Sequence, residues 1–196
     1  EPLPPVPSTF QARARNTMRN GLSSALMRPY FPYYRTHRPH SFILESVAWC
    51  WKLLMGQREA ERSAATWEAV KGQPYFTLPL QLNSDYQIRV HSPFGDMRAA
   101  LRFVIKSFAE HAPQGVALLV KRHPLDPGLV GWERLTRKLA AHYGVGDRVH
   151  YLSDWDIAEV VQTSLGVVTV NSTVGTLALN SAKPVVVLGH AVYKVP

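Results

Sequence analysis

The sequence has little of several features that mark particular protein classes. Its 196 residues include one cysteine, Cys50, which excludes an internal disulfide framework and any metal site built from several cysteines. Its longest apolar runs fall well short of the ~20 residues that cross a bilayer. Acidic residues are outnumbered, 14 against 22 lysines and arginines, so the formal charge is +8. Hydrophobic residues make up 46% of the chain, which is enough for one core and argues against disorder throughout.

Three motifs of common nucleotide and hydrolase sites are also missing. The chain has no Gly-x-Gly-x-x-Gly, no Walker loop and no Gly-x-Ser-x-Gly, which weakens dinucleotide oxidoreductase, P-loop and α/β-hydrolase interpretations. The sequence starts at Glu1 without a methionine, and its first residues lack the basic flank and apolar centre of a signal peptide. We therefore expect it to be part of a longer protein.

Positive charge is concentrated near the start of the chain. Before residue 40 there is one acid, Glu1, against six arginines: Arg13, Arg15, Arg19, Arg28, Arg35 and Arg38. A basic region favours an anionic partner such as a membrane surface, a phosphosugar or an acidic glycan, although a solvated helix face explains the arginines equally well. Because they are spread out and no nucleic-acid-binding module is recognisable, we expect no nucleic-acid partner.

The pattern of the sequence changes near residue 74 and divides the chain into three predicted parts. Residues 1–9 are an extended proline-rich lead. Residues 10–73 are a helical connector, with helices over 10–28 and 41–70 separated by three prolines within 29–40. Ser41 is the predicted cap of the second helix. The stripe that this helix should bury comprises Phe42, Ile43, Val47, Cys50, Leu53 and Leu54.

Residues 74–196 form the third part, in which short apolar runs alternate with helical patterns. Strands are predicted over 75–80, 115–121, 148–152, 165–170 and 184–188, and helices over 96–111, 132–143, 154–163 and 172–182. Near-continuous Val and Leu runs indicate strands buried on both faces, as in parallel sheets. The predicted fold class is therefore α/β, a Rossmann-like parallel sheet with flanking helices, preceded by a helical lead segment. Ligands of such sheets bind beyond the carboxyl ends of the strands.

The strand over 115–121 ends in cationic and titratable residues. Lys121, Arg122 and His123 precede Pro124, which fixes the turn and pushes His123 towards extended backbone. An imidazole beside a phosphate can donate a charge-assisted hydrogen bond, and it can stabilise or protonate a departing phosphate. A surface histidine in front of a proline turn explains the same spacing equally well.

The strand over 165–170 runs into a polar corner. Asn171, Ser172 and Thr173 offer side-chain donors where the next helix has free backbone N–H groups, which suits an anion. Gly175 would let the backbone approach a ligand closely. Helix capping by Ser172 or Asn171 explains this corner by itself. Taken with the Lys-Arg-His exit, however, the corner favours a phosphate site.

A third polar stretch follows the strand over 75–80. It runs from Gln81 to Gly95 and could cover a nucleotide or lie at a hinge. The next residue, Asp96, is predicted to cap the following helix. Without the two strand exits described above, this stretch is only weak support for a ligand site.

Two pairs of potential metal ligands have simpler explanations. Asp154 and Asp156 have the spacing of a metal-binding Asp-x-Asp pair, but aspartates are favoured in the first turn of a helix, and we interpret them as such. Pro39 lies between His37 and His40 and excludes a helical pair of ligands. We expect neither a metal nor a cofactor.

The order and spacing of seven segments resemble the pattern of a known family. These segments are Tyr34 to Arg38, Gln73 to Gln81, Asp85 to Gln87, His91 to Pro93, Lys121 to Pro124, Val170 to Gly175, and Gly189 to Tyr193. From about residue 30 onward the chain is similar to the bacterial capsule polysaccharide Kdo transferases. This resemblance implies the nucleotide-binding half of a two-domain, sialyltransferase-like GT-B fold. It also implies CMP-activated Kdo as the donor and a reaction without a metal.

The resemblance also implies roles for particular residues. His123 and Pro124 would be a His-Pro motif at the CMP phosphate, with His123 stabilising the leaving phosphate. Ser172 and Thr173 would be a hydroxyl pair on the same phosphate. The remaining expected substrate-binding residues are Gln81, Lys121, Asn171 and Gly175. No catalytic acid or base is identifiable.

The expected function is that of the CMP-Kdo-binding domain of a glycosyltransferase in capsular polysaccharide biosynthesis. Its acceptor would be a lipid-linked or glycan molecule, and its place the cytoplasm or the inner-membrane surface. A GT-B enzyme needs two Rossmann-like halves, so an acceptor-binding half should precede this chain. Two alternatives stay open: a non-catalytic assembly or export component whose basic lead holds anionic glycan or membrane, and half of a sugar-nucleotide epimerase, which would prefer UDP.

Overall fold

The computed structural model describes part of the N-terminal region and almost all of the remainder: residues 15, 19–23, 26–27, 29–31, 33, 42–83 and 85–193. The described helical residues before residue 28 lie within the first predicted helix, and the turn at 29–30 lies where that helix was expected to break. Residues 1–9, Tyr34, His37, Arg38 and Ser41 lie outside the described residues. The chain divides into two compact units, Glu1–Leu54 and Met55–Pro196; the predicted boundary after residue 73 stays a prediction.

Helix α2 (Phe42–Val70) confirms the second predicted helix, but its predicted buried stripe is wrong. Ile43, Val47, Leu53 and Leu54 are each more than half exposed, and Cys50 is exposed as well. The helix instead buries Ser63, Trp67 and Val70 near its end. Apolar residues recur at helical spacing in both halves of α2, and such a period does not tell which half has a neighbour to pack against.

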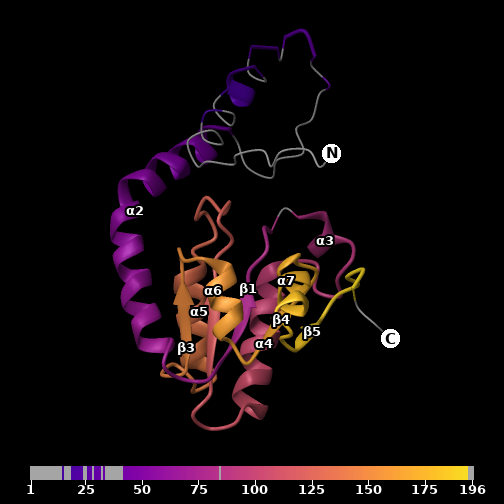
Figure 1. Ribbon diagram of the computed structural model, residues 1–196. Coiled ribbons are helices and arrows are strands. Elements are labelled where there is room, and N and C mark those ends of the chain that lie inside the picture. Colours follow the sequence, from indigo (N-terminus) through magenta and orange to yellow (C-terminus); the bar gives the residue numbers. More distant parts are fainter. Residues whose placement is uncertain are drawn as a thin grey trace, which may run out of the picture. The chain divides into compact units, whose positions relative to one another are not determined.

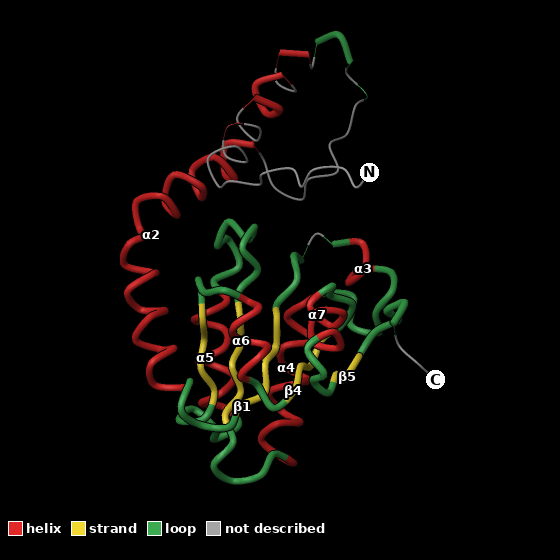
Figure 2. The backbone as a smooth tube through the Cα atoms, in the orientation of Figure 1, coloured by secondary structure: helices red, strands yellow, loops and turns green. Residues whose placement is uncertain are grey.

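Five parallel strands form one sheet in the order β3-β2-β1-β4-β5 (Figures 1 and 2). They are β1 (Tyr75–Pro79), β2 (Ala117–Lys121), β3 (Val149–Leu152), β4 (Gly166–Thr169) and β5 (Val185–Val187). Each lies within its predicted range and is slightly shorter. The parallel sheet and its flanking helices confirm the predicted fold class.

The helices between the strands are α3 (Tyr86–Arg89), α4 (Met97–His111), α5 (Trp132–His142), α6 (Ile157–Thr163) and α7 (Val174–Asn180). Short helix α3 was not predicted. The predicted cap Asp96 accepts a hydrogen bond from the N–H of Ala99 (2.7 Å). Asp156 caps α6 by accepting from the N–H of Ala158 (3.1 Å), whereas Asp154 lies before the first turn of that helix. Among the helices of the described segments, we find none with both the length and the apolar character needed to cross a membrane.

Successive residues of β2 face opposite sides of the sheet and join different clusters. Leu118 and Val120 pack with residues of α4 and α5, whereas Ala117 and Leu119 pack with Val160 of α6 and the end of α2. Apolar side chains on both faces explain why the sequence reads as a continuous Val and Leu run.

The strand order creates a switch point beside β1. Strand β1 pairs with β2 on one side and with β4 on the other. The chain moves outward from β1 through β2 to β3, then crosses back to β4 and moves outward again to β5. The connections after β1 and β4 therefore leave in opposite directions, which is where open α/β sheets form a ligand crevice.

Candidate functional site

The exits of β2, β1 and β4 lie side by side at the carboxyl edge of the sheet. Pro79 at the end of β1 is level with Lys121 at the end of β2, and the N–H of Leu80 donates to the carbonyl of Lys121 (2.8 Å). Because neighbouring strands lie about 4.8 Å apart, the exits of β2 and β4 are separated by about 10 Å. The corner with His123 and the corner with Ser172 and Thr173 therefore flank β1 at one edge.

Gln81 and Asn171 meet at the switch point. Gln81 is a buried residue, 4% exposed, and its Oε1 accepts a hydrogen bond from the backbone N–H of Asn171 (2.9 Å). The Asn171 Nδ2 donates in turn to the carbonyl of His91 (2.8 Å), in the connection between β1 and α4. Two predicted site residues that are 90 positions apart thus form one hydrogen-bonded unit.

The corner after β4 is held by short-range bonds. The Thr169 hydroxyl accepts from the N–H of Ser172 (3.2 Å), and the Ser172 hydroxyl accepts from the N–H of Val174 (3.2 Å). Thr173 is exposed and makes no side-chain cap bond to α7. The Ser172 hydroxyl therefore shapes the start of α7, while the Thr173 side chain faces solvent.

Gly175 is buried against Tyr193. A β-carbon at Gly175 would overlap the Tyr193 ring, whose hydroxyl donates to the carbonyl of Ser172. Burial raises the pKa of Tyr193 above its usual value, so the hydroxyl keeps its proton. The close approach that Gly175 permits is made by this tyrosine, and a contact between Gly175 and a donor stays a prediction.

The corner after β2 fixes the ring of His123. Its Nδ1 accepts a hydrogen bond from the backbone N–H of Leu125 (3.1 Å), and its carbonyl accepts from the N–H of Asp126 (3.0 Å). Because Nδ1 acts as an acceptor, the neutral ring carries its proton on Nε2. A half-buried imidazole held in this tautomer can donate through Nε2 to an anion.

Asp126 organises the turn behind His123, a role that the sequence reasoning missed. Its carboxylate is buried and accepts from the N–H of Gly128 (2.6 Å) and from the Trp132 indole N–H (2.6 Å). Gly128 has a φ of +88°, a conformation that suits glycine. The Asp-Pro-Gly segment at 126–128 is a turn signal that could have identified this corner.

Lys121 and Arg122 are both buried beneath the exit of β2. The Lys121 ammonium donates to the carbonyls of Arg122 (3.0 Å) and Ser153 (3.4 Å). The Arg122 guanidinium forms a two-pronged ion pair with the carboxylate of Glu59 on α2. Burial acts to lower the Arg122 pKa, but the bond to Glu59 and nearby negative charge raise it, so the group stays charged. A contact between Lys121 and a donor phosphate stays a prediction.

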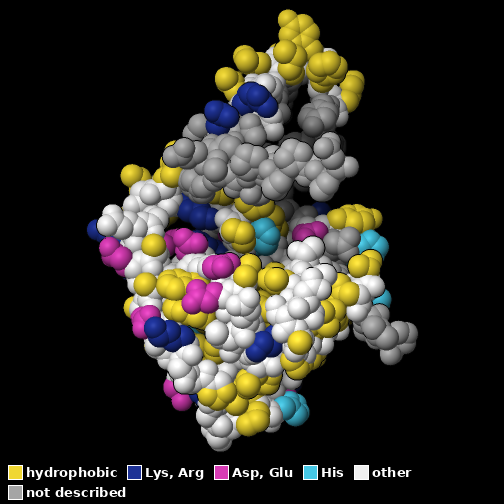
Figure 3. Space-filling model, in the orientation of Figure 1, with side chains coloured by type: hydrophobic (Ala, Val, Ile, Leu, Met, Phe, Trp, Pro, Cys, Tyr) yellow, Lys and Arg dark blue, Asp and Glu magenta, His cyan; other side chains and the backbone are white. Residues whose placement is uncertain are grey.

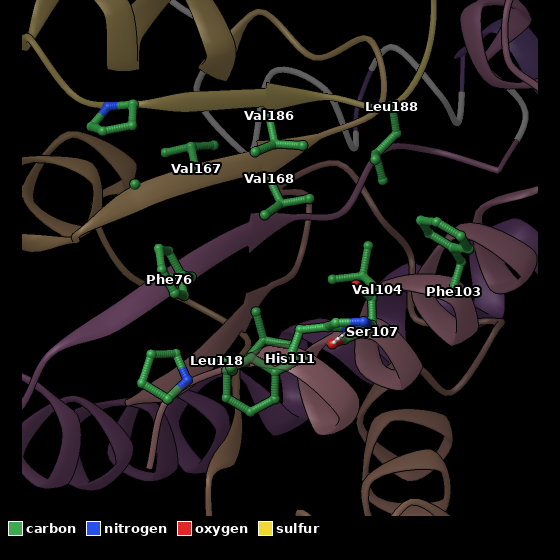
Figure 4. A pocket seen from close by; sticks show the side chains of 15 residues that line it. Phe76, Phe103, Val104, Ser107, His111, Leu118, Val167, Val168, Val186 and Leu188 are labelled. Atoms are coloured by element: carbon green, nitrogen blue, oxygen red, sulfur yellow. Dashed lines mark hydrogen bonds between the residues drawn. The ribbon is translucent and has the colours of Figure 1, made fainter. Parts of the chain in front are cut away.

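A cavity of about 340 Å³ lies on one face of the sheet, away from these loops. It is lined by residues of α4, β1, β2, β4 and β5, and Figure 4 shows Phe76, Val168 and Leu188 among them. Ser107 and His111 lie at one side, where the His111 Nδ1 donates to the Ser107 carbonyl (3.0 Å). The lining is largely aliphatic and aromatic, so this cavity is chemically unlike the polar loops at the sheet edge.

Charges of both signs are mixed on the face of the second unit shown in Figure 3, where lysine and arginine side chains alternate with acidic ones. Within the described residues, no group of three or more His, Cys, Asp or Glu side chains could hold a metal ion. Binding of an anionic partner by the arginine-rich region before residue 40 stays a prediction, since most of its arginines lie outside the described residues.

Known proteins are similar to this chain over almost its whole length. A protein-family model described as "Capsule polysaccharide biosynthesis protein" matches residues 2–196. The capsule polysaccharide export protein KpsS of Escherichia coli is 33% identical over 192 residues, which are 96% of this chain and 49% of that protein. The capsule polysaccharide modification protein LipB of Neisseria meningitidis serogroup B is 33% identical over 196 residues, which are 98% of this chain and 47% of that protein. The chain spans about half the length of these curated relatives.

Among solved structures, a similarity is found to KpsC of Thermosulfurimonas dismutans, described as a beta Kdo 2,7 transferase. The TM-score is 0.46 at 22% identity, and the match covers 69% of this chain and 42% of that one.

Proposed function

This chain belongs to the capsule polysaccharide biosynthesis protein family, and from that premise we propose that it is the donor-binding half of a glycosyltransferase that uses CMP-Kdo. The observation that carries the proposal is the position of the exits after β1, β2 and β4 at one edge of the sheet. The names of the relatives, which refer to capsule polysaccharide export and modification, support a role in the same process.

In this proposal the CMP phosphate lies over the exit of β1. The Nε2–H of His123 donates from one side, and the hydroxyls of Ser172 and Thr173 donate from the other. A hydrogen bond to a charged group contributes about 1.5–3 kcal/mol. As the bond from phosphate to sugar breaks, negative charge grows on the phosphate and these donors stabilise it. The buried ammonium of Lys121 adds positive charge below the exit of β2.

The other expected donor-binding residues have supporting roles. Gln81 sets the position of the Asn171 backbone through the bond described above. Pro124 fixes the turn after His123. Gly175 leaves room for Tyr193, which holds the carbonyl of Ser172. The phosphate-binding corners are thus positioned relative to one another by four residues: Gln81, Pro124, Asn171 and Gly175.

The whole protein would be a GT-B enzyme in which residues 74–196 form one Rossmann-like half. The other half would bind the acceptor, a lipid-linked or glycan molecule, and would supply the catalytic acid or base. We place the enzyme in the cytoplasm, in peripheral contact with the inner membrane.

Calorimetry with CMP tests the donor site. The 196-residue chain is expected to bind CMP, and His123→Ala to bind it at least tenfold more weakly, because a donor to the phosphate is lost (tenfold is 1.4 kcal/mol). His111→Ala is the matched control, since this exposed histidine lies at the end of α4 beside the cavity. Equal affinities in wild type and His123→Ala, or no binding by wild type, would contradict the proposal, and a preference for UMP would favour the epimerase alternative.

The second candidate is a non-catalytic component of capsule assembly or export. It is favoured by the name of the Escherichia coli relative, a capsule polysaccharide export protein, and by the formal charge of +8 of this chain. This candidate requires binding to an anionic glycan or to anionic vesicles that weakens as salt is raised. Such binding without affinity for CMP would favour it over the donor-binding proposal.

A further inference from the structure

The exit of β5 lies beside that of β4, on the side of β1 opposite β2 and His123. The N–H of Gly189 donates to the carbonyl of Val170 (3.1 Å), and a β-carbon at Gly189 would overlap the Asn171 side chain. Gly189 therefore lets the end of β5 lie directly against Asn171, which the proposed function places in the donor site. The next residue, His190, is exposed.

His190 is held by the same carbonyl that binds Asn171. The carbonyl of His91 accepts from the backbone N–H of His190 (3.2 Å), and the His190 Nδ1 lies 3.2 Å from it. A carbonyl oxygen can only accept, so Nδ1 carries the ring hydrogen in this contact. Nε2 is then an acceptor in the neutral ring, on the side of the imidazole away from His91.

We propose that His190 is a further donor-binding residue, whose Nε2 accepts a hydrogen bond from a hydroxyl or amino group of the nucleoside. This inference rests on the proposed function. His123 and His190 follow β2 and β5, which are three strand spacings apart in the sheet, or about 14 Å. They therefore contact different parts of one ligand, with His123 at the phosphate and His190 at the nucleoside.

Two amide variants separate binding from a purely structural role. The amide nitrogen of asparagine can take the place of Nδ1, so His190→Asn keeps the bond to the His91 carbonyl and removes Nε2. The longer side chain of glutamine reaches the position of Nε2, so His190→Gln keeps a polar acceptor there and loses the bond to His91. The matched controls are His111→Asn and His111→Gln, since the His111 Nδ1 makes a similar bond to the Ser107 carbonyl.

The affinity of the 196-residue chain for CMP, cytidine and inorganic phosphate is the measurement, with circular dichroism to confirm folding. His190→Asn is expected to bind CMP and cytidine about fivefold more weakly and phosphate unchanged, with His190→Gln close to wild type and both His111 variants unchanged. An unchanged CMP affinity in His190→Asn, or the reverse order of the two His190 variants, overturns the inference, because a residue that only holds the loop needs Nδ1 alone.

The arms of this experiment also separate the inference from the proposed function. If wild type binds CMP and His123→Ala weakens it while His190→Asn does not, the proposed function stands and the inference fails. If His190→Asn weakens the binding of phosphate alone, the inference also fails, since the imidazole would then contact the phosphate of the donor rather than its nucleoside. A wild-type chain that does not bind CMP overturns both.

Discussion

Replacing Glu59 with alanine is expected to lower the free energy of unfolding by about 3 kcal/mol, because it leaves the Arg122 guanidinium charged without its partner. Removing one member of a buried ion pair typically costs 3–5 kcal/mol. The Arg122 side chain is 7% exposed and that of Glu59 30% exposed, so we expect the lower end of this range. Arg122 also has a buried Nε without a hydrogen-bond partner, which makes the loss of its two bonds to Glu59 more costly.

Urea unfolding with Glu61→Ala as the control measures this effect. Glu61 lies on the same helix and is exposed, so its replacement should change stability by less than about 0.5 kcal/mol. The double variant Glu59→Ala with Arg122→Met should recover part of the loss, because no charge is then left buried. If Glu59→Ala and Glu61→Ala had the same free energy of unfolding, and the slope of that free energy against urea concentration were unchanged, the ion pair would not stabilise the protein as described.

Replacing Asp126 with alanine is expected to affect both stability and CMP binding. The substitution leaves the Gly128 N–H and the Trp132 indole N–H without their acceptor, and a buried donor left unsatisfied costs about 1–3 kcal/mol. We therefore expect a loss of about 2–4 kcal/mol. Because the N–H of Asp126 also bonds the carbonyl of His123, a disordered turn should misplace the imidazole and weaken CMP binding.

Asp126→Asn separates the two effects, since asparagine keeps one acceptor oxygen and the shape of the turn. It should lose less stability than Asp126→Ala and less affinity for CMP. Asp147→Ala is a suitable control on an exposed aspartate in front of β3. If Asp126→Ala destabilised the protein while leaving CMP affinity unchanged below its unfolding transition, the turn would not position His123.

The sheet could be predicted from the sequence because each strand has its own local signal. Residues 117–121 form an uninterrupted buried strand, and runs of this kind occur in parallel strands covered on both faces. The stripe on α2 could not be predicted in the same way. Apolar residues occur along both halves of α2, Ile43 in the first and Trp67 in the second. Only the folded structure shows that Trp67 packs on the sheet while Ile43 is exposed.

The polar corners of the candidate site were identified from strand exits, but the bonds that hold them were not. Arg122 and Glu59 are 63 positions apart, and Gln81 and Asn171 are 90 apart. A single sequence gives no signal for such pairs, since either partner has an ordinary local explanation. Gly175 is a similar case. The sequence indicates that another group lies close to its backbone, but it does not indicate that this group is the Tyr193 ring.

The central claim is that the exits of β1, β2 and β4 bind one nucleotide together, and backbone amide NMR with CMP tests it most directly. The account predicts that the amide signals of Leu125, Asn171 and Val174 shift along one saturation curve, because each of these N–H groups bonds a side chain of the proposed site. The signals of Ser107 and Val186 at the cavity should stay unchanged. Shifts confined to the cavity, a shift of Leu125 alone or of Asn171 and Val174 alone, or different saturation curves for the three signals would contradict it.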